Sequence, residues 1–185
     1  MSILEYILLS GALTLPMMYA MHSCTFGVSL RLSRGLAIAL VLALEQSLLA
    51  VLGLFLGSTL SLNMAEYDKL IFLGLMVVVA VRMIMSVPHK KKEKEPVVYD
   101  ITRWGTVLLL GIARGTNAFL AGLGAGFIAT FSDEVLSFAL PVFFFTLIFS
   151  YWGVMSGRQQ FPVHPRRWVL LSTVALLVIT LKVAL

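Results

Sequence analysis

Six long apolar stretches occupy most of this chain, and each is close to the length of about 20 residues that a helix needs to cross a lipid bilayer. They cover Ser2–His22, Gly35–Gly57, Tyr67–Val87, Trp104–Ile128, Val135–Ser156 and Trp168–Leu185. In lipid only helices and closed barrels satisfy their backbone groups, and these stretches are too long and too uniformly apolar for barrel strands. The sequence therefore predicts an all-α membrane protein with six transmembrane helices.

The composition agrees with a chain that lies almost wholly in the membrane. Hydrophobic residues make up 59% of its 185 residues and charged residues 12%, whereas soluble domains use about 25% charged residues. So little polar sequence leaves no room for a soluble catalytic domain. The formal net charge of +5 fits a membrane protein whose basic loops face anionic lipid head groups. We therefore expect membrane lipids as partners and no nucleic acid.

The basic residues gather in alternate loops and thereby predict the orientation of the helices. Ten of them belong to the first, third and fifth loops, and two belong to the opposite side. Short loops rich in Lys and Arg stay in the cytoplasm. We therefore expect a multi-pass protein of the cell (inner) membrane, with loops one, three and five cytoplasmic and both termini outside. The ten residues are Arg31, Arg34, Lys90, Lys91, Lys92, Lys94, Arg103, Arg158, Arg166 and Arg167.

The chain also resembles itself at a constant offset of 100 residues. Residues 1–87 and 104–185 would then be two repeats of three spans, joined by a basic cytoplasmic hinge at 88–103. Because each repeat has an odd number of spans, the two would be inverted, as in many secondary transporters. The GxxxG pairs among the matches are also a common helix-packing surface. The matches are Gly11 with Gly111, Gly53 with Gly153, Gly57 with Gly157, and Arg82 with Lys182, two cations near helix ends from which they reach the interface.

Few polar residues lie inside the spans, and the ionisable ones carry the functional interpretation. Glu45 falls near the middle of the second span, and Arg114 and Asn117 fall near the middle of the fourth. Thr14 has the corresponding place in the first span. A charge at this depth is costly, so we expect Glu45 and Arg114 to face the bundle interior and to pair with each other. Such a pair either fixes the helix register or handles a solute or a proton.

Two positions predict local breaks in the spans. Pro16 removes a helical hydrogen bond in the first span, and Gly115 lies in a run of small residues that opens the backbone of the fourth. Broken helices at matching places in two halves indicate a transport site. A separate face carries Met17, Met21 and Cys24, whose sulfur atoms suit soft ions such as Cu(I). Ordinary packing is the alternative interpretation of that face.

Taken together, these features resemble the bacterial manganese efflux pump family, six-span proteins of two inverted repeats within the lysine-exporter-like transporters. The resemblance runs through nearly the whole chain and rests on the order and spacing of four segments. It implies export of Mn²⁺ as a substrate, without a resident cofactor, through a site that includes Glu45 and Asn117 as metal ligands. The four segments are Leu44-Glu45-Gln46, Val81–Ile84, Ile112–Gly124 and Thr146–Arg158.

The chain departs from this family at two acidic positions. The family carries intramembrane acids in its first and fourth helices, where this sequence has Leu15-Pro16-Met17 and Thr116-Asn117-Ala118. Mn²⁺ prefers several oxygen ligands with carboxylate charge, and Arg114 adds a fixed positive charge close to Asn117. A second hypothesis therefore stays open, in which Arg114 binds an amino-acid-like or anionic solute and Glu45 is the counter-charge.

Three classes of function remain after these arguments. A transporter of the manganese-exporter type comes first, a diverged transporter of an amino-acid-like or anionic solute second, and a membrane scaffold without transport activity third. An enzyme is not expected, because the chain has no HExxH or CxxC motif and no second acid at the depth of Glu45. Binding of metals and of anions distinguishes the three classes.

Overall fold

The computed structural model describes residues 2–28, 30–62, 65–86, 100–129, 131–159 and 165–184. This part of the chain contains six α-helices and no strand, so the all-helical prediction is confirmed. The start of the first helix is fixed locally, because Ser2 and Glu5 form a reciprocal capping box with bonds of 2.9 and 3.3 Å. The helices are α1 (Ile3–Thr25), α2 (Leu32–Ser61), α3 (Asp68–Met85), α4 (Trp104–Ile128), α5 (Phe131–Arg158) and α6 (Pro165–Ala184), with a short 3-10 turn η1 (Ala65–Tyr67).

Four helices in the described part are long and apolar enough to cross a membrane. They are α1, α2, α4 and the portion Glu134–Arg158 of α5. The shorter α3 has 18 residues and holds three charged side chains, those of Asp68, Lys69 and Arg82. The chain is thus a helical membrane protein, and crossing by α3 and α6 stays a prediction.

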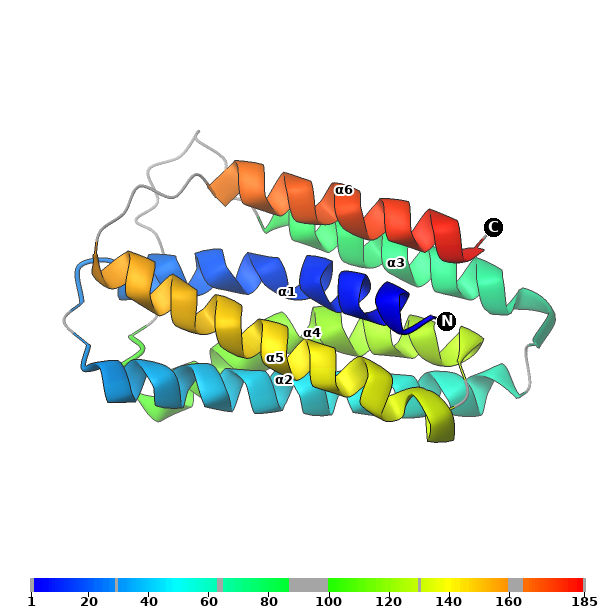
Figure 1. Ribbon diagram of the computed structural model, residues 1–185, viewed down its shortest axis with the longest axis horizontal. Helices are drawn as coiled ribbons and strands as arrows, with labels where there is room; N and C mark the ends of the chain where they lie inside the picture. Colours follow the sequence, from blue (N-terminus) through cyan, green and yellow to red (C-terminus); the bar gives the residue numbers. More distant parts are fainter. Residues whose placement is uncertain are drawn as a thin grey trace.

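The helices run along the long axis of the molecule, and both chain ends lie at the same end of the bundle (Figure 1). The most extensive contacts join α2 to α4 and α1 to α5. Further contacts join α2 to α5, α3 to α4, α1 to α6 and α3 to α6. The central helices are therefore α1, α2, α4 and α5, while α3 and α6 cover one side of α4 and α1. Near the termini, Lys182 Nζ lies 3.3 Å from Glu5 Oε1.

Glycines let the central helices approach each other closely. A Cβ at Gly53 of α2 would lie 2.8 Å from the backbone N of Leu123 in α4, closer than side chains pack. Gly57 meets the same helix one turn later. On α5, Gly153 and Gly157 pack on the backbone of α1 in the same way. The packing interpretation of the two GxxxG pairs is confirmed.

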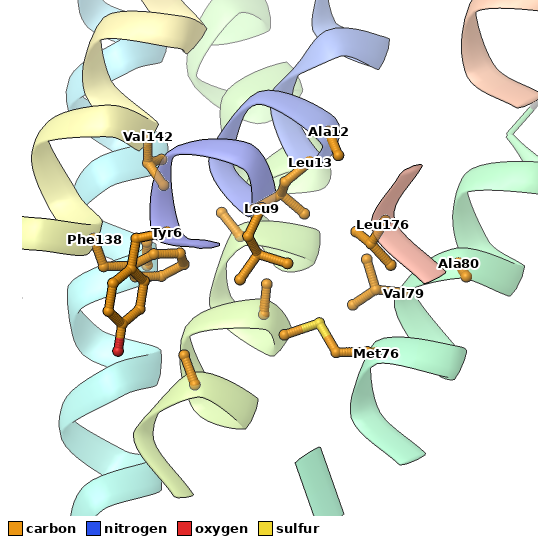
Figure 2. Packing of buried hydrophobic residues seen from close by; sticks show 14 of the residues in the cluster. Tyr6, Leu9, Ala12, Leu13, Met76, Val79, Ala80, Phe138, Val142 and Leu176 are labelled. Carbon is orange, nitrogen blue, oxygen red and sulfur yellow. The ribbon is translucent and has the colours of Figure 1, made fainter. Parts of the chain in front are cut away.

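Buried apolar side chains form two core clusters, which lie at different levels along the four central helices. Along α1, residues 6–13 contribute to the first core cluster and residues 17–24 to the second. Figure 2 shows side chains of α1, α3, α5 and α6 meeting in the first core cluster. The second is built from α1, α2, α4 and α5 together with Leu30 and Ile101 outside the helices.

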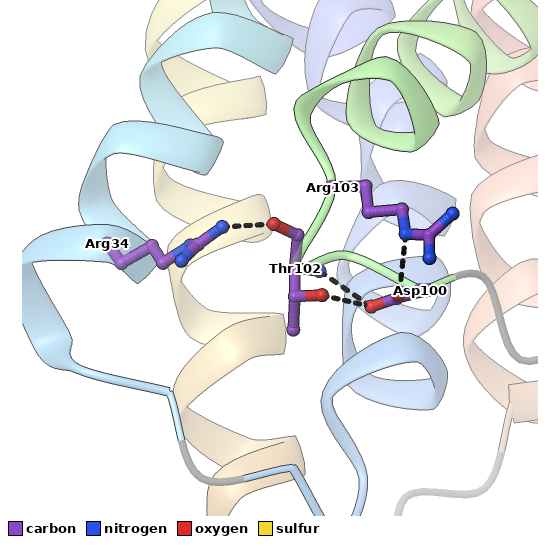
Figure 3. Close-up of polar contacts among 4 residues, drawn as sticks. All are labelled: Arg34, Asp100, Thr102 and Arg103. Carbon is purple, nitrogen blue, oxygen red and sulfur yellow. Dashed lines mark hydrogen bonds and ion pairs between the residues drawn. The ribbon is translucent and has the colours of Figure 1, made fainter.

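The predicted hinge is described only from Asp100 onward, and its lysines lie outside the described residues. Asp100 Oδ1 accepts a bond of 3.0 Å from the backbone N of Thr102, and its Oδ2 lies 3.4 Å from Arg103 Nε (Figure 3). Hydrogen bonds from the side chain and backbone of Thr102 lower the pKa of Asp100. Arg34 at the start of α2 donates to the carbonyl of Thr102 (Figure 3). This contact joins the beginning of α2 to the segment that leads into α4.

Candidate polar site between the core clusters

Polar side chains separate the two core clusters on three of the four central helices, α2, α4 and α5. On α5, the buried residues Val142, Thr146, Ser150 and Val154 follow one another at i+4 spacing and share one face. Val142 belongs to the first core cluster and Val154 to the second. The apolar core along this face is therefore interrupted by two buried hydroxyl groups.

The helices α2 and α4 show the same interruption. In each, a residue of one core cluster is followed at helical spacing by a polar residue and then by a residue of the other cluster. The sequences are Leu42–Gln46–Ala50 on α2 and Leu110–Arg114–Ala118 on α4. On α1, Leu9, Leu13 and Met17 continue the apolar row, and the buried Ser10 and Thr14 lie beside it. We call the six polar residues Ser10, Thr14, Gln46, Arg114, Thr146 and Ser150 the polar layer.

Glu45 lies beside the polar layer rather than on the face that forms it. It is half-buried at the α2–α4 contact, and its Oε2 presses against Gly111, where a Cβ would overlap this oxygen. Gln46, one residue later, is 5% exposed and points to the core. Glu45 Oε2 has no hydrogen-bond partner among the described residues, so the predicted contact with Arg114 is not made through this atom.

The fourth helix brings Arg114 and Asn117 to the same level. Arg114 is half-buried on the polar-layer face, and Asn117 is half-buried three residues later. The guanidinium of Arg82, which the sequence predicts at the interface, lies instead against the middle of α4. Its Nη2 is 2.5 Å from Thr116 Oγ1, and Thr116 in turn donates to the carbonyl of Ala113 at 2.9 Å. The central part of α4 therefore carries Arg114 and is contacted by Arg82 of α3.

Among the described residues, every buried side-chain polar atom without a hydrogen-bond partner is an oxygen. Five of the six belong to the polar layer or to its neighbours Glu45 and Asn117. Oxygen atoms are the ligands that Mg²⁺, Ca²⁺ and Mn²⁺ prefer. The six atoms are Ser10 Oγ, Glu45 Oε2, Asp68 Oδ1, Asn117 Oδ1, Thr146 Oγ1 and Ser150 Oγ.

The two predicted helix breaks fall within continuous helices. α1 runs through Pro16, and α4 runs through Gly115. Because proline has no N–H, the carbonyl of Ala12 still lacks its usual helical donor. A Cβ at Gly115 would lie 3.8 Å from Gln46 Nε2, so this glycine places the α4 backbone beside the polar layer.

The sulfur face of α1 packs in the second core cluster. Met17, Met21 and Cys24 are each at most 5% exposed and contact apolar neighbours there. Among the described residues, no three His, Cys, Asp or Glu side chains lie together where they could hold a metal ion. The described structure therefore favours the packing interpretation over a soft-metal path.

The sequence interpretation named Thr14, Arg114 and Asn117 but missed four polar residues at this level. They are Ser10, Gln46, Thr146 and Ser150. Serine and threonine are common in membrane helices, where they usually bond to their own backbone. The available signal was position, because Thr146 and Ser150 lie one turn apart and Gln46 lies 100 residues before Thr146.

Comparison with known proteins supplies the family context. Residues 29–184 match the model of a family described as "Putative manganese efflux pump". The "Putative manganese efflux pump MntP" of Actinobacillus succinogenes is 28% identical over 124 residues, which cover 66% of this chain and 63% of that protein. The "Putative manganese efflux pump MntP 1" of Wolinella succinogenes is 26% identical over 190 residues, which cover 98% of this chain and 97% of that protein. No solved structure matches.

Proposed function

The chain belongs to this manganese efflux pump family, whose model matches most of its length, and on that premise we propose that it exports a small charged solute across the cell (inner) membrane. Mn²⁺ is the first candidate substrate. The observation that carries the proposal is the polar layer, which interrupts the apolar core on α2, α4 and α5 and adds buried hydroxyls on α1. Polar groups are expensive inside a membrane and mark substrate pathways there.

An inverted-repeat architecture with six crossings is part of the proposal. Exchanging α1 with α4, α2 with α5 and α3 with α6 turns the six most extensive helix contacts into one another. The glycine contacts support the same exchange, since Gly11 meets Phe145 and Gly111 meets Glu45. Sites of transporters built from inverted repeats lie at the repeat interface near the membrane midplane. We propose this place for the polar layer, which is drawn from two helices of each half.

The proposed orientation follows from the two ends of the bundle. Both termini lie at one end (Figure 1), and Arg34 and Arg103 mark the other, where α2 and α4 begin. Basic residues favour the cytoplasmic side. We therefore place this second end in the cytoplasm and the termini outside, so that export runs from the Arg34 end toward the termini.

Chemically, the polar layer and its neighbours Glu45 and Asn117 offer oxygen ligands and little net charge. Glu45 supplies one carboxylate, and Asn117 and the unpartnered hydroxyls supply neutral oxygens. A transporter must release its ion as well as bind it, so a site with few charges suits turnover better than a tight cage. In alternating access, one three-helix half would rock against the other and expose the layer first to the cytoplasm and then outside.

A second candidate substrate is an amino-acid-like or anionic solute. The specific observation in its favour is Arg114, which lies on the polar-layer face of α4. A guanidinium binds carboxylates through two parallel hydrogen bonds and opposes a divalent cation nearby. Here Glu45 would balance the charge of Arg114 rather than bind the solute.

Transport by the purified protein in liposomes tests both candidates. We expect uptake of Mn²⁺ down an imposed gradient and its loss in Glu45→Ala, while Glu66→Ala, which changes an exposed acid outside the central helices, keeps the wild-type rate. Uptake of an amino acid that is lost in Arg114→Ala would support the second candidate instead. If the protein neither transports nor binds any of these solutes, the proposal is refuted and a scaffold is favoured.

A further inference from the structure

Three buried hydroxyl groups in the central helices make no hydrogen bond. Ser10, Thr146 and Ser150 are each 0% exposed, and their hydroxyl oxygens have no partner among the described residues. Within a helix, a serine or threonine hydroxyl can always reach the carbonyl three or four residues earlier. A buried hydroxyl that does not make this bond is costly for the fold.

Other buried hydroxyls of this chain do make that bond. Thr14 donates to the carbonyl of Ser10 at 2.7 Å, Thr180 to that of Leu176 at 2.7 Å, and Ser156 to that of Gly153 at 3.1 Å. The exception is therefore local. It concerns one residue of α1 and two of α5, the helices whose contact is among the most extensive in the bundle.

We propose that Thr146 and Ser150 are the contribution of α5 to the substrate site, where their hydroxyl oxygens bind the transported cation. This inference rests on the proposed function. The two residues lie at i and i+4, which puts their Cβ atoms about 5–6 Å apart on one face. From Cβ atoms at that separation, the two side chains can turn their hydroxyl oxygens toward one ion or pass it along the helix. Ser10 on α1, the helix that packs on α5, is a third neutral hydroxyl without a partner among the described residues.

A cation explains the residue types better than an anion does. The buried unpartnered atoms around the layer are oxygens of hydroxyl, amide and carboxylate groups, which are the ligands of hard divalent ions. Arg114 is the α4 member of the polar layer, so neutral hydroxyls on α5 place the ion against a different helix from the fixed positive charge. The lost acids of helices one and four would then be replaced in part by hydroxyl ligands.

The test compares Thr146→Val and Ser150→Ala with Thr180→Val and Ser156→Ala. The control residues are buried hydroxyls of the same types, and Ser156 is on α5 itself, but both bond to their own backbone. Mn²⁺ uptake in liposomes and the thermal midpoint of each purified variant are measured. We expect the KM for Mn²⁺ to rise about tenfold in each α5-layer variant, the equivalent of about 1.4 kcal/mol, and to stay unchanged in the controls.

The thermal midpoints should move in the opposite sense. Removing an unpartnered hydroxyl costs no hydrogen bond, so Thr146→Val and Ser150→Ala should be as stable as the wild type or more stable, whereas both controls should be less stable. Wild-type KM values in both layer variants, or a loss of stability equal to that of the controls, would overturn the inference. If the wild type itself does not take up or bind Mn²⁺, the proposed function fails first and the inference fails with it.

Discussion

Replacing Gly111 by alanine should move the Glu45 carboxylate without removing it. The new Cβ would overlap Glu45 Oε2 and lie 2.6 Å from Glu45 Cδ and 3.2 Å from Leu42 Cδ2. Because carbon contacts settle near about 3.5–4 Å, the carboxylate has to shift by roughly 2 Å. Its atoms are the far end of a flexible side chain, so the backbone of α2 and α4 need not move.

The cost to stability should therefore be small and the cost to transport large. An off-rotamer Glu45 costs about 0.5–1.5 kcal/mol, and alanine stabilises a helix interior by up to about 1 kcal/mol relative to glycine. We expect the free energy of unfolding to change by less than about 1 kcal/mol. A binding group misplaced by about 1 Å lowers rates as much as a hundredfold, so Mn²⁺ uptake should fall at least tenfold.

The matched control is Gly105→Ala. It makes the same substitution in the same helix at a position where no atom lies within 4 Å of the new Cβ. Uptake of Mn²⁺ into liposomes and thermal unfolding in detergent are measured for both variants. Equal uptake in Gly111→Ala and Gly105→Ala would refute the reasoning, because the position of the Glu45 carboxylate would then have no bearing on transport.

Three further predictions follow from the packing, the topology and the hinge. Gly53→Ala should lower the free energy of unfolding by about 1–3 kcal/mol through overpacking, because the new Cβ meets the backbone of α4. The control Gly74→Ala, with no atom within 4 Å of the new Cβ, should not destabilise the protein, and equal thermal midpoints of the two variants would contradict the close contact. In a chain without Cys24, Lys91→Cys should not react with impermeant thiol reagents added outside intact cells. Rapid labelling would contradict the predicted orientation. Asp100 has a lowered pKa, so its stabilising effect is present above its ordinary pKa of 3.8 and is lost as pH falls through the lowered value; Asp100→Asn should be less stable than the wild type at neutral pH and equally stable in strong acid.

The class of the protein and its helices could be predicted from the sequence alone. Long apolar stretches have one stable arrangement in lipid, because only a helix satisfies its backbone within one segment. The GxxxG spacing likewise predicted close packing, because two glycines one turn apart expose the backbone whatever their neighbours are. These are local properties of the chain.

The composition of the candidate site was decided by the tertiary structure. Glu45 and Gln46 are adjacent in the sequence, yet a rotation of about 100° per residue sends Gln46 into the core and leaves the Glu45 carboxylate against Gly111. Only the rotation and depth of packed helices determine which of two neighbouring polar residues enters the polar layer. The same holds for Thr146 and Ser150. The residue type does not show whether a hydroxyl bonds to its own helix or points elsewhere, because that depends on what packs against it.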